Sequence, residues 1–588
     1  MASVALVASL AASGCGGGPR TSTDVATKPT RSSAAGPNEP SVTGSVSAPL
    51  GLPCREKNGV RLCAPAELDQ RVPSFDGTPI DLNVFLPASR SGPWPTVVLI
   101  HGYGGSKDSV GSGTPSALAR RGYVVVVPSM RGFGNSCGPD ASTRNLGCSE
   151  GFIHNADQRY EVRDVQTLLG WLVDERVASR RALASAGGSY GGGISLELAF
   201  LRNRIRLPDG SFAPWRSPAG APIALKAAWA TSPWSDLASA LAPNGRSLES
   251  SAVPFGTTVD PPGVPTSLSL NALASIGGSS GWAGAAGSDG KGQLGIWAAT
   301  LAADPSSQGS AQVLAEMHKF HSAAGISGTP SALLLEAGWT DDLFPPREAL
   351  RVLLARSTRN RAALLIGDLG HSRAQNRPDD TRWATSLGLA FLQRQLRSVP
   401  GGPAAGSVSA RSMICGSGSP QAWTTSSWAD LHPRAVEGRW RGAGVLSSRV
   451  GASSVTGQAE ARLGACDTVP ESMRAARHTY NLTSKGFTLA GLPVVRANLS
   501  SSGGVGQIVA RLWDVSGGRQ RLITRGVYRV TQGQHGQVAF QLNGNAYKFA
   551  AGHTVRLELL GADPPLFQGD TQPATVQVSE VELRLPVR

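Results

Sequence analysis

The sequence RALASAGGSYGGG at residues 181–193 joins a short apolar run to Ile194–Leu201, which has helical periodicity. This order of strand, sharp turn and helix carries a G-x-S-x-G pattern at residues 187–191, with a serine on the turn. Glycines are expected around such a serine, because side chains there would collide with the strand and the helix. The pattern predicts that Ser189 is an exposed nucleophile. A glycine-rich turn that happens to contain serine is the alternative in a chain with 72 glycines.

A serine nucleophile needs a base and an acid, and in such a sheet an acid and then a histidine follow it along the chain. Asp341 and His371 each come directly after a predicted strand, where a doubly wound sheet gathers its chemistry. We predict that His371 accepts the proton of Ser189 and that Asp341 orients the imidazole. Asp342 competes for the role of the acid, and capping the next helix is the alternative role for Asp341.

The candidate oxyanion hole combines the backbone N–H of Tyr190 with a donor from the loop that begins at His101. Either the N–H or the phenol of Tyr103 is the expected second donor. Aromatic packing beneath a lid is the alternative role for Tyr103.

The alternation of strands and helices places residues 48–400 in an α/β domain with a mostly parallel, doubly wound sheet. Residues 233–328 lose this alternation and are rich in Gly, Ser, Pro and Ala, so we predict that they form a lid over the site. After a Pro/Gly linker at 398–406, residues 405–588 show short alternating runs separated by turns. They predict an all-β sandwich of the jelly-roll kind.

Six of the seven cysteines form near-neighbour pairs: Cys54 with Cys63, Cys137 with Cys148, and Cys415 with Cys466. In an exported protein this spacing predicts three local disulfides, and the alternative is reduced thiols in a cytosolic protein. The formal charge of +14 comes without a nucleic-acid-binding motif, so we predict no nucleic-acid partner. No C-x-x-C pair or histidine cluster indicates a metal site.

Residues 1–14 are apolar and rich in small side chains, and they end just before Cys15. This resembles the end of a bacterial lipoprotein signal peptide, with Cys15 as the lipidated residue. Residues 15–47 have the composition of a flexible tether. We predict an exported protein, either secreted or anchored to the cell surface through Cys15.

Several segments together resemble the X-Pro dipeptidyl-peptidase and cocaine-esterase family of serine hydrolases. Residues 131–136 (RGFGNS) are similar to its R-G-x-G-x-S motif, and residues 188–192 to its nucleophile motif. Residues 338–341 resemble its acid loop, Gly370-His371 its histidine position, and residues 510–526 its C-terminal jelly-roll domain. The resemblance extends over about residues 70–588.

The resemblance implies an α/β-hydrolase domain with an inserted lid, followed by a jelly-roll domain. It also implies an acyl-enzyme mechanism without a cofactor, with the phenol of Tyr103 as an oxyanion donor. The implied substrate is a peptide with proline at its second position, and a carboxylic ester or amide is the alternative. A surface protein that binds a glycan or peptide without catalysis is the alternative from another class.

Overall fold

A computed structural model describes residues 48–57, 59–89, 91–144, 146–249, 260–284, 293–371, 373–448, 462–473, 478–570 and 572–588. The predictions for the leader, for the tether and for Cys15 lie outside these residues. Within them, none of the helices combines the length and the apolar character that crossing a bilayer requires.

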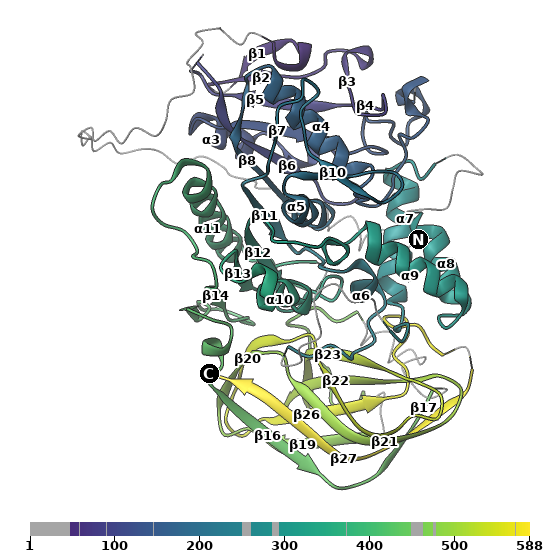
Figure 1. Cartoon of the computed structure of the whole chain (residues 1–588). Coiled ribbons are helices and arrows are strands. Elements are labelled where there is room, and N and C mark those ends of the chain that lie inside the picture. The colour runs from purple at the N-terminus through teal and green to yellow at the C-terminus, as the bar shows by residue number, and fades with distance from the viewer. Residues whose placement is uncertain are drawn as a thin grey trace, which may run out of the picture.

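One large sheet organises the N-terminal domain (Figure 1). Its strands run in the order β1 (Cys54–Lys57), β2 (Val60–Cys63), β5 (Leu82–Leu86), β7 (Val124–Pro128), β6 (Trp94–Ile100), β8 (Ala178–Gly188), β11 (Ala227–Thr231), β12 (Ala332–Gly338), β13 (Ala362–Gly367), β14 (Val408–Arg411) and β15 (Ala422–Thr425). The strands from β7 to β14 pair in parallel, and those at the two edges pair antiparallel. Central strands such as β7 (VVVVP) are buried along their whole length, because helices cover both faces.

Helices pack on the two faces of this sheet. One face is covered by α3 (Gly113–Arg120) and α11 (Pro378–Arg397), and the other by α4 (Glu161–Asp174), α5 (Tyr190–Leu201) and α10 (Pro346–Leu354). Side chains that alternate along each strand divide between the two layers: Val98 and Ile100 of β6 join one core, whereas Val97 and Leu99 join the other. The predicted doubly wound α/β architecture is confirmed.

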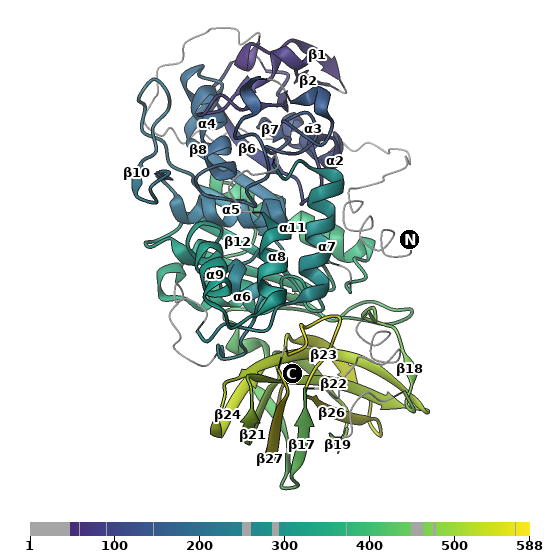
Figure 2. The ribbon, with the colours of Figure 1, turned by 90° about the vertical axis from the view of Figure 1, so that its right-hand side faces the viewer.

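The insertion between β11 and β12, which we call the lid (residues 233–328), combines helices with irregular segments in its described part. It contains α6 (Leu237–Leu241), α7 (Ser267–Ser280), α8 (Leu294–Ala303) and α9 (Gln308–Phe320). Figure 2 shows α7, α8 and α9 next to one another, with the C-terminal domain below them. The sequences of α7 and α8 are mostly Ser, Ala, Gly and Leu, so they lack the apolar periodicity that would predict helices.

The C-terminal domain is a sandwich of two antiparallel sheets. One sheet contains β24 (His535–Gln541), β21 (Val494–Gly503), β27 (Ala574–Val587), β20 (Phe487–Gly491) and β25 (Asn545–Phe549), with β16 (Arg434–Trp440) and β17 (Gly444–Ser447) paired to β27. The other contains β18 (Val469–Pro470), β23 (Arg519–Val530), β22 (Gly506–Ser516), β26 (Thr554–Leu560) and β19 (His478–Thr483). Side chains of both sheets share one core, which confirms the predicted all-β fold.

The boundary between the domains lies later than the sequence suggested. Strands β14 and β15 follow the predicted linker, yet they extend the large N-terminal sheet by pairing with β13 and with each other. The first strand of the sandwich is β16, at Arg434. Short strands predict an all-β region equally well whichever sheet they join, so composition could not place this boundary.

Three disulfides join the cysteines that lie near one another in the sequence: Cys54–Cys63, Cys137–Cys148 and Cys415–Cys466. The described structure also contains helix α2 (Lys107–Val110) and two short hairpins: β3 (Val72–Pro73) with β4 (Pro79–Ile80), and β9 (Arg204–Arg206) with β10 (Phe212–Pro214). The first hairpin turns at Asp76-Gly77.

Candidate active site

Ser189 lies on a strained turn between β8 and α5. Its φ angle is +56°, which is rare for a residue with a side chain. The backbone N–H of Ser189 donates to the carbonyl oxygen of Thr231 at 2.9 Å, which fixes the turn against the neighbouring strand. This geometry raises the hydroxyl above the carboxyl end of the sheet, as the G-x-S-x-G pattern predicts.

The glycines around Ser189 are required by close backbone approaches. A Cβ atom on Gly191 would lie 2.3 Å from the carbonyl oxygen of Ile100, and one on Gly192 would lie 2.3 Å from that of Thr231. Real Cβ contacts are essentially never shorter than 3.0 Å. The start of α5 therefore packs directly on the backbone of β6 and β11, which only glycine permits.

The side chains of Ser189, His371 and Asp341 form a continuous chain of hydrogen bonds. His371 Nε2 lies 2.8 Å from Ser189 Oγ, and His371 Nδ1 lies 2.7 Å from Asp341 Oδ2. Asp341 follows β12 and is fully buried, and His371 follows β13 and is 9% exposed. Three residues that are far apart in the sequence thus meet because β8, β12 and β13 end at the same edge of the sheet.

Backbone groups hold the Asp341 carboxylate in place. Its Oδ1 accepts hydrogen bonds from Leu343 N at 3.0 Å and Phe344 N at 3.1 Å, and its Oδ2 accepts from His371 N at 3.3 Å. With these bonds the carboxylate has little freedom to turn away from the imidazole. The aromatic ring of Phe344 also packs edge-on against His371, with ring centroids 5.3 Å apart.

Asp342, the competing acid, faces away from His371. Its Oδ2 accepts from Arg525 Nε at 2.9 Å and from Arg373 Nη1 at 3.3 Å. Burial favours the neutral acid, but the charges of Arg525 and Arg373 outweigh it and hold the pKa of Asp342 below its ordinary value. The structure therefore brings Asp341, and not Asp342, to the imidazole.

The candidate oxyanion donors lie in an aromatic cluster. The first N–H groups of an α-helix have no partner within the helix, and Tyr190 is the first residue of α5. The ring of Tyr103 packs edge-on against Tyr190 and Phe133, at centroid distances of 5.5 and 5.3 Å. Its hydroxyl lies next to α7, 2.5 Å from where a Cβ on Gly277 would be. Burial first, and then the charge of Glu161, raise the pKa of Tyr103, so its phenol remains a donor at neutral pH.

His101 fixes the start of the loop that carries Tyr103. Its Nε2 accepts from Met130 N at 2.9 Å, so Nδ1 carries the proton and donates to the Gly102 carbonyl at 2.8 Å. Burial lowers the pKa of His101 to about 4, which keeps the ring neutral. His101 thus has a structural role in the loop.

The RGFGNS segment is attached to the lid just after α7. Arg131 is completely buried and binds Asp164 through Nε at 2.7 Å and Asp76 through Nη1 at 2.9 Å. Next to it, the Gly132 carbonyl accepts from Trp282 N at 2.8 Å, just after α7. The segment therefore connects a buried ion-pair network to the lid.

Glu161, which no sequence pattern singled out, lies in the first turn of α4, next to the nucleophile turn. Its Oε1 accepts from Tyr190 Oη at 3.1 Å and from His154 N at 2.7 Å, and its Oε2 accepts from Asp157 N at 3.0 Å. Burial raises the pKa of Glu161 to about 8, so the side chain is largely protonated at neutral pH. The available signal was a charged residue beside the apolar positions of the sequence that forms α4.

One group of described residues has donor atoms close enough to share a metal ion: Asp157, Glu316 and His321. Arg159 Nη2 already bridges its two carboxylates, at 2.5 Å from Asp157 Oδ2 and 2.6 Å from Glu316 Oε1. The guanidinium therefore supplies the cation that these carboxylates need.

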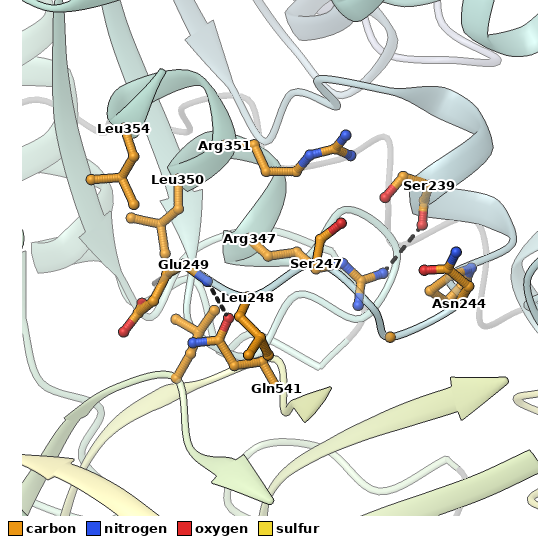
Figure 3. A pocket seen from close by; sticks show the side chains of 13 residues that line it. Ser239, Asn244, Ser247, Leu248, Glu249, Arg347, Leu350, Arg351, Leu354 and Gln541 are labelled. Carbon is orange, nitrogen blue, oxygen red and sulfur yellow. Dashed lines mark hydrogen bonds between the residues drawn. The ribbon is translucent and has the colours of Figure 1, made fainter. Parts of the chain in front are cut away.

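A cavity of about 70 Å³ lies between the two domains (Figure 3). Arg347 and Arg351 of α10 line one wall, and Glu249 and Gln541 line another, where Glu249 N donates to Gln541 Oε1 at 2.8 Å. None of the three hydrogen-bonded residues Ser189, His371 and Asp341 lines it.

Comparison with known families agrees with this two-domain organisation. Residues 76–204 match the X-Pro dipeptidyl-peptidase (S15 family) model, and residues 432–584 match the X-Pro dipeptidyl-peptidase C-terminal non-catalytic domain. The second match begins close to β16, as the corrected domain boundary requires. No curated protein matches the sequence.

Solved structures share the fold over nearly the whole chain. An aminopeptidase from a marine sediment Thaumarchaeota archaeon is 15% identical, with 94% of this chain and 99% of that chain covered and a TM-score of 0.56. A CocE/NonD family hydrolase from Staphylococcus aureus is 12% identical, with 90% and 94% covered and a TM-score of 0.55. An α-amino acid ester hydrolase is 16% identical, with 94% and 98% covered and a TM-score of 0.53. At these identities the likeness concerns the fold alone.

Proposed function

We propose that this chain, a serine hydrolase of the X-Pro dipeptidyl-peptidase (S15) family, releases Xaa-Pro dipeptides from peptides through an acyl-enzyme on Ser189. The observation that carries the proposal is the chain of hydrogen bonds from Ser189 through His371 to Asp341. Both domain matches are to X-Pro dipeptidyl-peptidase models, which favours a peptide substrate with proline at its second position.

In the first half-reaction His371 Nε2 accepts the proton of Ser189 Oγ while that oxygen attacks the proline carbonyl carbon. The carbonyl oxygen becomes an oxyanion, which the Tyr190 N–H and a donor from the Tyr103 loop stabilise. His371 then gives its proton to the leaving amine as the C–N bond breaks. An acyl-enzyme ester on Ser189 remains.

In the second half-reaction a water molecule attacks the ester carbonyl and gives a proton to His371 Nε2. The ester C–O bond breaks, His371 returns the proton to Ser189 Oγ, and the dipeptide leaves with a new carboxylate. In both steps Asp341 holds the Nδ1–H tautomer and stabilises the imidazolium. Removing one oxyanion donor from such a site typically costs about 3 kcal/mol of transition-state stabilisation.

The substrate class is tested with an Ala-Pro anilide that has either a free or a blocked N-terminus, beside a short-chain nitrophenyl ester. We expect cleavage of the anilide with a free N-terminus and little cleavage of the blocked one. Ser189→Ala should cleave neither the anilide nor the ester. Turnover of the ester alone would assign the chain as a carboxylic ester hydrolase. Full activity in Ser189→Ala would overturn the mechanism.

The alternative from another class, a binding protein without catalysis, is tested by a fluorophosphonate probe. We expect the probe to label the folded protein and not Ser189→Ala, because phosphonylation requires an activated serine. Folded protein that resists labelling would favour the binding role.

We also propose that the chain is exported and anchored through a lipid on Cys15. The three disulfides support export, because such bonds persist in oxidising compartments. Membrane association that is lost in Cys15→Ser is the expected result, and equal partitioning of both proteins would contradict it.

A further inference from the structure

The acid loop (residues 338–344) is held by side chains from the C-terminal domain. Asp342 lies in this loop, directly after the triad acid. Its carboxylate binds Arg525 of β23 through both Nε and Nη2, each at 2.9 Å, and Asn543 Nδ2 at 3.2 Å. Arg525 is 1% exposed, so this contact between the domains is shielded from water.

The histidine loop (residues 367–373) is attached to the same part of the C-terminal domain. Arg373, two residues after His371, donates through Nε to the Leu463 carbonyl and through Nη2 to the Leu522 carbonyl, both at 3.1 Å. The Arg373 carbonyl accepts from Ala465 N at 2.9 Å. Arg373 also reaches the Asp342 carboxylate at 3.3 Å, so the two catalytic loops share one anchor.

We propose that Arg525 is a positioning residue of the active site: together with Arg373 it grips Asp342, and the C-terminal domain thereby holds the acid loop and the histidine loop in register. This inference rests on the proposed catalytic triad. The domain then contributes to catalysis through geometry, without touching substrate.

The covalent path from the anchor to the triad is short. One peptide bond separates Asp342 from Asp341, and the Asp341 carboxylate also depends on the backbone N–H groups of Leu343 and Phe344 on the far side of Asp342. A rotation of the loop at Asp342 would therefore move the carboxylate and two of its donors together. Displacements of about 1 Å at a catalytic group cost on the order of 100-fold in rate.

The burial of this cluster makes the anchor selective for arginine. A buried carboxylate that loses one partner keeps its desolvation penalty, so the loop is expected to move toward other donors or toward water. Lysine in place of Arg525 keeps the charge but not the two-point contact, because its ammonium is a single compact group.

The test compares Arg525→Met and Arg525→Lys with Arg556→Met. Arg556 is a matched control: it is 4% exposed, and its partners Glu471, Asn481 and Gln520 belong to the C-terminal domain. Each full-length variant is assayed with the nitrophenyl ester over a range of pH, and its folding is checked by circular dichroism and thermal unfolding.

We expect Arg525→Met to lower kcat by about tenfold or more, with KM changed by less than about threefold. The acid limb of the kcat/KM profile should also differ from that of the wild type, because His371 would be separated from the carboxylate of Asp341. Arg525→Lys should recover part of kcat, and Arg556→Met should leave both quantities unchanged. These results together would support the positioning role.

If Arg525→Met and Arg556→Met give the same kcat and the same acid limb, the contact is only structural and the proposal fails. Should Arg525→Met not fold, Arg525→Lys takes its place, because it keeps the charge but not the two-point contact with Asp342. A shifted acid limb in Arg525→Lys supports the proposal, and a wild-type profile overturns it. The ester substrate keeps this test independent of the proposed peptidase activity. Failure to cleave the Ala-Pro anilide would not affect the comparison of Arg525 and Arg556 variants with the ester.

Discussion

Replacing Gly370 with alanine should disable the active site while leaving the fold in place. Gly370 directly precedes His371 and has a φ angle of +117°. An added Cβ would lie 2.6 Å from Asp341 Oδ2, the same oxygen that His371 Nδ1 approaches to 2.7 Å. The methyl group and the imidazole would therefore compete for one side of one carboxylate.

The size of the effect follows from the geometry. Ordinary contacts of a Cβ begin at 3.4 Å, so the carboxylate or the histidine loop must move by 3.4 − 2.6 = 0.8 Å. A shift of this size at a catalytic group corresponds to a loss of about 10- to 100-fold in kcat, or about 1.4 to 2.7 kcal/mol in activation free energy. The positive φ angle adds strain of about 1 to 2 kcal/mol to the folded state.

Gly401 provides a matched control for that strain. Its φ angle is +116°, and an added Cβ would meet nothing within 4 Å. Gly401→Ala should lose about the same stability in urea unfolding and keep wild-type kcat with the nitrophenyl ester. The reasoning would be refuted if the kcat of Gly370→Ala lay within a factor of about two of the Gly401→Ala value, since steric displacement of the acid would then have no consequence.

Three further outcomes are expected. Asp341→Asn should lower kcat by about 10⁴-fold, because the amide favours the wrong imidazole tautomer. Asp342→Asn should lower kcat by only about tenfold. Equal losses of kcat in steady-state assays would contradict the assignment of Asp341 as the acid. Gly277→Ala should displace the Tyr103 phenol, which lies 2.5 Å from the new Cβ, and so lower kcat/KM. The control is Gly278→Ala, whose Cβ meets nothing within 4 Å and which should keep the wild-type kcat/KM. The same kcat/KM in the two variants would contradict this prediction. Since burial raises the pKa of Glu161 from 4.5 to about 8, the folded state binds a proton that the unfolded state has lost between those values, and stability should fall as pH rises through them. Between pH 5 and 8 the free energy of unfolding in urea should fall by an amount on the order of 4 kcal/mol in the wild type, and Glu161→Gln should reduce this fall. Parallel plots of unfolding free energy against pH for the two proteins would contradict the prediction.

The sequence predicted the parts of the site that local pattern determines. Ser189, Asp341 and His371 each follow an apolar run that ends in a turn, and the ends of parallel strands meet at one edge of a sheet. Local pattern could not separate Asp341 from Asp342, because neighbouring loop residues can face opposite ways. The choice depends on Arg525, which lies 183 positions away in the sequence.

Some helices, strands and contacts could not be predicted from the sequence, for physical reasons that differ in each case. Helices α7 and α8 are built from small residues and have no apolar stripe, so periodicity could not reveal them. Strands β14 and β15 are as short as β17 of the C-terminal sandwich, and only their hydrogen-bond partners show that they belong to the first sheet. The role of Glu161 depends on contacts with Tyr190 and with the loop before α4, which pattern alone does not predict.

The C-terminal domain contacts the lid as well as the catalytic loops. Arg529, four residues after Arg525 on β23, donates through Nη2 to the Gly263 carbonyl at 2.8 Å, and Gln568 N donates to the Pro265 carbonyl at 2.7 Å. Both acceptors lie within the four residues before α7, the helix that packs against Tyr103. The C-terminal domain thus contacts the acid loop, the histidine loop and the segment before α7. Two separate domains joined by a flexible linker would leave each of these segments free to move alone, whereas a shared support makes their relative positions a property of the whole chain.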